Sequence, residues 1–451
     1  MREETGALAL SERIASGAQS IPALMEETLD RIERSETNAI VSLRDRDALM
    51  AEAEERSRSE PAGWLHGIPL AVKDLVQTAG IRTTFGSPLF ADYVPEEDDL
   101  LAARLRAAGA ILIGKTNVPE FGLGSNTFNP VHGITRNPYD PSRTPGGSSG
   151  GAAAALAERL VPVADGSDMM GSLRNPAAFC NVYGMRPTHG LVPAGPAGDP
   201  LLHPLSTDGP MARDPHDLAA LLYTLSEPHP AWPFAVRRPG AEVVASKGRI
   251  GWLGSMGLPI EEGIVETCEA ALAPFDVEVI DLPFPTETLW EAWVTLRAYA
   301  VAMKQRAAWP EGRSQMKAPV VWEIETGLAL TPTRLQDASE VRIAALAALA
   351  PLWDRFDAIA APSVQVMPFP VEVEYPTAVA GRSMDTYHRW MEVMVLASLL
   401  GLPALACPAG FVGGLPTGFQ LIGPKGSDGR LLALAARYHD ATRWPQERPP
   451  G

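Results

Sequence analysis

Short apolar segments alternate with helical patterns along this chain, and this alternation limits the possible folds more than any other feature. Residues 67–72 and 110–113 are predicted to be buried strands, and residues 100–108 between them have the spacing of a helix. Further strands are predicted at 249–253, 277–280 and 356–361, and helices over most of 286–356. Strands that are apolar along their whole length need cover on both faces. We therefore expect an α/β fold, with a sheet between two layers of helices.

The chain shows no internal repeat and no clear linker that would divide its 451 residues. Residues 1–60 have a helical pattern, which Pro61 ends. We predict an N-terminal helical segment, 1–60, and a main unit, 61–451, within one large domain. Residues 193–240 are rich in proline and are expected to form a surface excursion.

The charge balance argues against two classes of partner. Lys and Arg total 38 against 54 Asp and Glu, which gives a formal net charge of −16. Nucleic acids and anionic membrane surfaces both attract Lys and Arg, and this chain has no basic run. We therefore expect no nucleic acid and no membrane as partners, and a substrate that is neutral or apolar.

The sequence also predicts a cytoplasmic location. Its first residues contain no apolar segment, so no signal peptide is expected. The uncharged stretch 393–424 is long enough to cross a bilayer, but Gly401, Pro403 and Pro408 interrupt it, and buried strands and turns are expected instead. Three cysteines without a C-x-x-C pair predict neither a disulfide framework nor a zinc site.

Two short motifs match known patterns but fail in context. Residues 109–116 match the P-loop, yet the four residues between its glycines are themselves the predicted strand, whose N–H groups cannot wrap phosphates. Nucleotide binding therefore stays a weak alternative. Ser314 and Lys317 match S-x-x-K, but the chain lacks the S-D-N and K-T-G motifs that accompany it.

A long segment without periodicity, 115–190, is rich in Gly, Ser, Asn and Pro, and such stretches are usually functional or disordered. Within it, residues 146–151 match the G-x-S-x-G elbow twice, but turn residues precede them where an elbow needs a strand. A lysine can replace the histidine base if burial lowers its pKa to about 7–8. Lys73 fits this role, because it follows the apolar strand 67–72.

With these residues the sequence resembles the amidase signature family of serine hydrolases, over most of its length. Residues 67–74 resemble the lysine strand of that family, 145–151 its glycine–serine loop and 168–176 its nucleophile segment. The resemblance implies the family fold, a central mixed β-sheet covered on both faces by helices. It also implies that neither a metal nor an organic cofactor is needed.

The resemblance assigns a role to each matching side chain. Ser172 is the expected nucleophile, and Ser148, which follows a cis peptide bond in relatives, relays the proton. Lys73 is the expected base and later the acid for the leaving nitrogen. The expected oxyanion hole consists of the backbone N–H groups of Met169, Met170, Gly171 and Ser172. The residues expected to support the site are Ser149, Asp168 and Arg174.

The substrate site is expected to contain Gly124, Ser125 and Asn126, which match a lining segment of relatives, together with Met170. At position 170 the family usually has a glycine, so the acyl pocket should differ from that of the glutamine-specific members. The departure resembles hydrolases of nylon-oligomer cyclic dimers, and the chain as a whole resembles bacterial aryl acylamidases and urethanases. Tryptophans between 290 and 322 are candidates for an aromatic pocket wall.

The resemblance therefore predicts a hydrolase that cleaves the C–N bond of a small-molecule amide, anilide or carbamate and works as a monomer or homodimer. One alternative is an amidase-fold subunit of a tRNA-dependent amidotransferase, which would need a partner. The glutamine-specific members carry two glycines before the nucleophile, and this chain does not. The other alternative is the nucleotide-binding protein suggested by 109–116.

Overall fold

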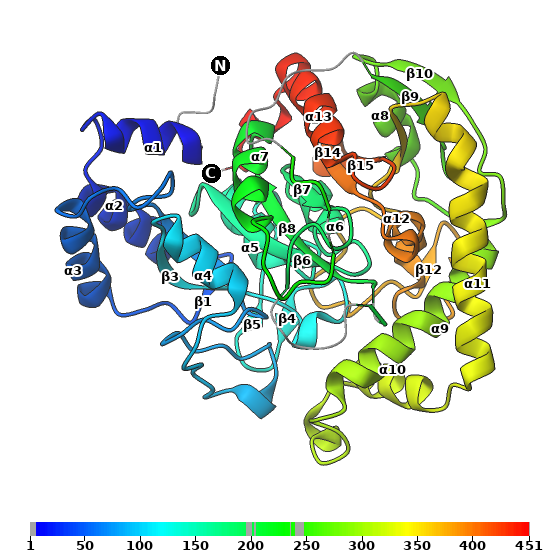
Figure 1. Ribbon diagram of the computed structural model, residues 1–451, viewed down its shortest axis with the longest axis horizontal. Coiled ribbons are helices and arrows are strands. Elements are labelled where there is room, and N and C mark those ends of the chain that lie inside the picture. Colours follow the sequence, from blue (N-terminus) through cyan, green and yellow to red (C-terminus); the bar gives the residue numbers. More distant parts are fainter. Residues whose placement is uncertain (1–5, 195–200, 203, 235, 240–247, 451) are drawn as a thin grey trace.

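A mixed eight-stranded sheet is the largest element of the structure (Figure 1). The computed structural model describes residues 6–194, 201–202, 204–234, 236–239 and 248–450. The strand order is β10-β9-β11-β15-β14-β7-β8-β6. The strands are β6 (Val163–Asp168), β7 (Tyr183–Arg186), β8 (Thr207–Ala212), β9 (Arg249–Trp252), β10 (Asp276–Val279), β11 (Ala358–Pro362), β14 (Ala404–Val412) and β15 (Leu415–Ile422). Only β9 pairs in parallel, with β10 and β11, and the other pairs are antiparallel.

A smaller sheet carries the first predicted strands. Its order is β1 (Ile40–Val41), β3 (Ile111–Thr116) and β2 (Pro69–Lys73), and β2 runs parallel to β3. All five residues of β2 are buried, as its apolar sequence predicts. β2 packs against β6 at the edge of the large sheet. Lys73, the last residue of β2, therefore lies between the two sheets.

Helices cover the large sheet and confirm the predicted fold class (Figure 1). α6 (Arg174–Phe179) and α8 (Ile264–Ala271) pack on β14 and β15, while α7 (Pro215–Leu225) packs on β7 and β8, and α13 (Asp428–Thr442) on β14. Three longer helices lie together on one side of the molecule: α9 (Thr286–Gln305), α10 (Ala318–Leu328) and α11 (Pro332–Leu349). The first four helices are α1 (Ala7–Ala15), α2 (Ile21–Arg34), α3 (Arg46–Ser57) and α4 (Leu100–Ala107).

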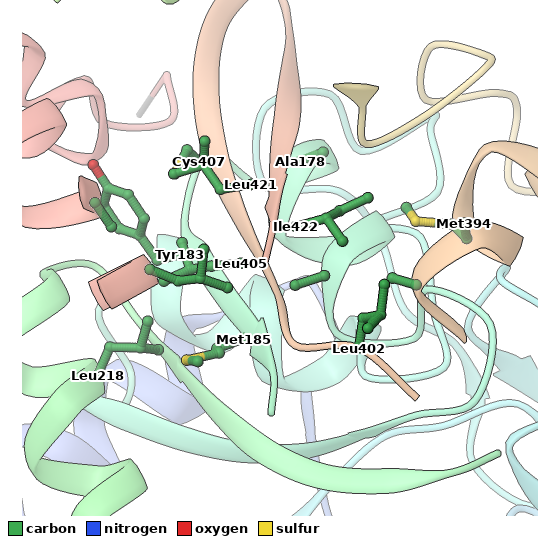
Figure 2. Close-up of a cluster of buried hydrophobic side chains, with 14 of the residues drawn as sticks. Ala178, Tyr183, Met185, Leu218, Met394, Leu402, Leu405, Cys407, Leu421 and Ile422 are labelled. Carbon is green, nitrogen blue, oxygen red and sulfur yellow. The ribbon is translucent and has the colours of Figure 1, made fainter. Parts of the chain in front are cut away.

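The main core lies where β7, β14 and β15 meet the helices. Figure 2 shows Met185, Leu405 and Leu421 from these strands beside Ala178 of α6 and Leu218 of α7. The same buried cluster reaches α1 and α2 through apolar residues of the N-terminal segment. The chain therefore forms one domain, whose largest core cluster includes residues of the N-terminal segment, and the division at residue 61 stays a prediction.

β6 and β8 are among the strands that lie where the sequence predicts irregular structure. β6 falls in the segment 115–190, which lacks a periodic pattern, and β8 falls in 193–240, the expected surface excursion. β8 instead lies inside the sheet, between β7 and β6. Both strands contain polar residues and glycine, so backbone pairing rather than an apolar pattern defines them.

The uncharged stretch 393–424 contains a helix that its sequence did not reveal. α12 (Val395–Leu400) precedes the expected buried strands β14 and β15 and ends at Gly401, whose φ of 64° is left-handed. Among the described residues, no helix combines the length and apolar character that a membrane crossing requires.

Candidate active site

Lys73 ends strand β2 with its amine surrounded by hydroxyl groups. The side chain is 1% exposed. Its Nζ lies 2.8 Å from Ser148 Oγ, 2.8 Å from Ser149 Oγ and 3.0 Å from Ser167 Oγ. The backbone N–H of Lys73 donates to the carboxylate of Asp165 on β6. The structure thus brings together the predicted lysine and both serines of the glycine–serine loop.

Burial sets the protonation of this amine. Removal from water lowers the pKa of Lys73 to about 7, although the carboxylates of Asp165, Asp208 and Asp168 act in the opposite direction. Near neutral pH a large fraction of the amine is therefore unprotonated and can accept a proton. A lysine on the surface would be almost entirely charged at that pH.

The loop that carries Ser148 is fixed by hydrogen bonds to its backbone. The peptide bond between Gly147 and Ser148 is cis, as in the relatives that the sequence resembles. Ser125 Oγ donates to the carbonyl of Gly147 at 2.9 Å, and Thr127 Oγ1 donates to that of Gly146 at 2.7 Å. Helix α5 (Gly150–Ala157) begins directly after Ser149. Ser148 therefore sits on a short, immobilised turn.

Ser172 lies in the turn after β6, in reach of the same loop. Its carbonyl accepts a hydrogen bond from the Ser149 N–H at 3.1 Å, which joins the two serine segments. Ser172 is 8% exposed, and both Ser172 and Ser148 line one cavity. The predicted nucleophile and the predicted proton relay thus face the same space.

Asp168 organises the turn that carries Ser172. Its carboxylate accepts from the N–H groups of Gly171 at 2.7 Å and Leu173 at 3.2 Å. Arg174 donates to both carboxylate oxygens, at 3.0 and 3.1 Å. Burial alone would raise the pKa of Asp168, but Arg174 and Arg186 hold it well below its usual range. Asp168 and Arg174, both expected to support the site, thus form a completely buried ion pair.

One member of the predicted oxyanion hole needs correction. The N–H of Gly171 is taken by Asp168, so it cannot also donate to a substrate oxygen. The N–H groups of Met169, Met170 and Ser172 make no hydrogen bond within the described part of the chain. These three groups remain the candidate donors.

The cavity beside the serines encloses about 580 Å³ of empty space, part of which is open to solvent. One wall consists of 121–125, which includes the predicted residues Gly124 and Ser125, and another of Met169 and Met170. Asn126 is also predicted to line the site, but its side chain turns away and donates to the carbonyls of Val371 and Val373. That prediction is wrong for Asn126.

A tryptophan outside the cavity fixes the side chain of Met170 by a hydrogen bond. Met170 is 2% exposed, and the indole N–H of Trp293 donates to its sulfur at 3.1 Å. Trp293 itself is fully buried and does not reach the cavity. None of the tryptophans between 290 and 322 lines the cavity, so these candidates do not contribute to its wall. The tryptophan shapes the pocket indirectly, by fixing the thioether.

The third wall of the cavity is one face of α9, which the sequence does not assign to the site. Its lining residues are Arg297, Val301, Lys304 and Gln305. Successive members of this set are four, three and one positions apart, and residues at these intervals lie on one face of a helix. This spacing is visible in the sequence, but nothing there shows that the face meets a site formed about 130 residues earlier.

The nucleotide-binding alternative is contradicted by the position of Lys115. Residues Ile111–Thr116 form strand β3, and the amine of Lys115 donates to the carbonyl of Val76 and, at 2.7 Å, to Thr78 Oγ1. Lys115 is fully buried and is not among the residues that line the cavity beside the serines. In the described ranges, His, Cys, Asp and Glu side chains also form no group of three or more that could hold a metal ion.

Comparison with known proteins identifies relatives over nearly the whole chain. The family described as Amidase matches residues 23–432. One subunit of the glutamyl-tRNA(Gln) amidotransferase of Thermus thermophilus is 34% identical, over 95% of this chain and 96% of the relative. A bacterial aryl acylamidase of the amidase signature family superposes with a TM-score of 0.90, at 27% identity and 99% coverage of both chains. A 6-aminohexanoate cyclic dimer hydrolase bound to substrate superposes with a TM-score of 0.86, at 26% identity and 98% coverage of both chains.

Proposed function

This chain belongs to the amidase signature family of C–N hydrolases, and we propose that it cleaves small-molecule amides, anilides or carbamates through a covalent intermediate on Ser172. The observation that carries the proposal is the contact between the buried, partly unprotonated Lys73 amine and Ser148 in the cavity that Ser172 lines. A neutral lysine is the base that this chemistry needs.

In the first step Lys73 accepts the proton of Ser148 Oγ, while Ser148 accepts the proton of Ser172 Oγ. The Ser172 oxygen then forms a bond to the substrate carbonyl carbon, and the carbonyl π electrons move to the oxygen. The N–H groups of Met169, Met170 and Ser172 are the candidate donors to that oxyanion. Each fixed donor of this kind is worth about 100- to 1000-fold in rate.

In the second step the oxyanion collapses and the C–N bond breaks. The proton held by Lys73 returns through Ser148 to the leaving nitrogen, so an amine departs and an acyl- or carbamoyl-enzyme remains. Water then attacks the same carbonyl, with Lys73 again accepting a proton through Ser148. The bond between the Ser172 oxygen and the acyl carbon breaks, and the proton returns from Lys73 through Ser148 to the Ser172 oxygen. Carbamates fit this sequence because their carbonyl carbon is attacked in the same way.

The proposal is tested by a panel of anilides, aliphatic amides and aryl carbamates, with product amine measured. Ser172→Ala should lower kcat by a factor on the order of 10⁶. Lys73→Met should also abolish turnover, whereas Lys115→Met, the matched change of a buried lysine on the neighbouring strand, should not. Near-normal turnover by Ser172→Ala would refute the mechanism.

A second function is favoured by one finding, the similarity to a protein of the glutamyl-tRNA(Gln) amidotransferase assembly. Met170 and the acidic net charge of −16 weigh against a role with tRNA. We expect the purified chain to hydrolyse amides alone, as a monomer or homodimer of the cytoplasm. Glutamine hydrolysis that appears only with a stoichiometric partner protein would favour the amidotransferase instead.

A further inference from the structure

The face of α9 that lines the cavity is polar and cationic. Arg297, Lys304 and Gln305 line the cavity with Val301 between them. Lys304 follows Arg297 by seven positions, which places their backbones about 10 Å apart along the helix. Arg297 lies beside Met169, near the nucleophile turn, and Lys304 is exposed. The row of donors thus extends from the nucleophile turn along the cavity wall.

Arg297 has one donor group without a strong acceptor. Its Nε donates to Glu323 Oε1 at 2.5 Å and its Nη2 to the Tyr387 hydroxyl at 2.7 Å. Its Nη1, in contrast, contacts only the thioether sulfur of Met169, at 3.4 Å. Thioether sulfur is a weak acceptor, and Arg297 is 4% exposed. An oxygen of a bound ligand would be a better partner for this buried group.

The side chains of Lys304 and Gln305 are also available to bind a ligand in the cavity. Within the described residues neither side chain makes a hydrogen bond or an ion pair. The described residues that line the cavity include Arg297 and Lys304 but no Asp or Glu. Lys304 acts electrostatically on the carboxylate of Asp208 and would lower its pKa, although burial raises that pKa overall. In the described part of the chain, no ion pair joins the two residues.

We infer that this α9 face binds a carboxylate of the substrate, so that the enzyme acts on amides or carbamates that carry a carboxylate remote from the scissile bond. The inference rests on the proposed function and replaces the neutral or apolar substrate expected from the overall charge. The chain is acidic as a whole, whereas the residues that line the cavity include Arg297 and Lys304 but no carboxylate, and this lining therefore favours anionic ligands that the remaining surface repels.

The test compares substrates that differ only in charge. The 4-nitroanilides of succinic, glutaric and adipic acid are compared with their methyl esters, and acetylated 4-aminobenzoate is compared with its ester. We expect kcat/KM for the carboxylate to exceed that for the ester by about ten- to a hundredfold in at least one pair, the range of a charge-assisted hydrogen bond. Lys304→Met should reduce this ratio at least tenfold, and the ratio should fall at high salt.

Lys425→Met is the matched control, since Lys425 lies outside the cavity and should leave the ratio unchanged. A ratio near one in every pair, while the neutral esters are hydrolysed, would overturn the inference and leave the proposed function intact. If neither member of any pair is hydrolysed, and the aliphatic amides and aryl carbamates of the first panel are not hydrolysed either, the proposed function fails. In that case the inference is tested independently by calorimetry, which measures the binding of glutarate to Ser172→Ala. We expect binding to this variant and its loss in Ser172→Ala/Lys304→Met. The absence of binding to Ser172→Ala would overturn the inference.

Discussion

Replacing Lys73 with methionine should abolish activity and yet stabilise the protein at neutral pH. The pKa of Lys73 falls from its ordinary value of 10.5 to about 7, mainly because the amine is buried. Each pH unit corresponds to about 1.4 kcal/mol, so burial disfavours the charged amine by roughly 5 kcal/mol. Methionine fills a similar volume without that cost. It loses the hydrogen bonds to three serines, which offset part of the gain.

The difference in unfolding free energy between wild type and Lys73→Met should depend on pH, and this dependence isolates the cost of burying the charged amine. Because the folded pKa is lowered, the unfolded chain binds more protons between pH 7 and 10.5, and wild-type stability should rise with pH relative to Lys73→Met. Between pH 7 and 9 the expected relative gain is about 2 kcal/mol. Urea unfolding of both proteins at pH 7, 8 and 9 measures it. A constant difference across this range, or a variant less stable than wild type at pH 7, would refute the reasoning.

Three further outcomes follow from the site. The initial-rate kcat/KM should fall about tenfold per pH unit below pH 7, as Lys73 becomes protonated; a profile that is flat from pH 5.5 to 7 would contradict the base assignment. Asp168→Asn should lower the free energy of unfolding by about 3–5 kcal/mol, because it leaves Arg174 buried without its counterion; denaturant midpoints at equal m-value measure this, and a loss below 1 kcal/mol would be inconsistent with the ion pair. Met170→Ala should cost about 2–5 kcal/mol and raise relative turnover of bulkier acyl groups, since it removes the side chain that Trp293 holds against the cavity; unchanged acyl preference would show that Met170 does not shape the pocket.

The catalytic candidates could be identified from sequence because each lies in a distinctive local context. Lys73 follows a run of apolar residues, which predicts its burial, and Ser148 and Ser172 lie in glycine-rich segments whose spacing resembles that of a known family. The structure brings the lysine and Ser148 within hydrogen-bonding distance. Local patterns are sufficient where a residue and its immediate neighbours determine the environment.

The remaining parts of the site depend on contacts that no local pattern reveals. Asn126 is adjacent to a lining residue, but the distant carbonyls of Val371 and Val373 turn its side chain away. The N–H of Gly171 is not available to the oxyanion hole, because the turn directs it to the carboxylate of Asp168. The α9 wall reaches the site only through the tertiary fold. Strands β6 and β8 were not predicted, because polar residues near the active site interrupt the apolar pattern by which strands are identified in the sequence.

The central claim is that Ser172 forms a covalent bond with the substrate or its analogues. Mass spectrometry of protein treated with a fluorophosphonate measures this directly. We expect one adduct, located on the peptide that contains Ser172, with labelling slowed in Lys73→Met and lost in Ser172→Ala. An adduct on another residue, or undiminished labelling of Ser172→Ala, would contradict the account.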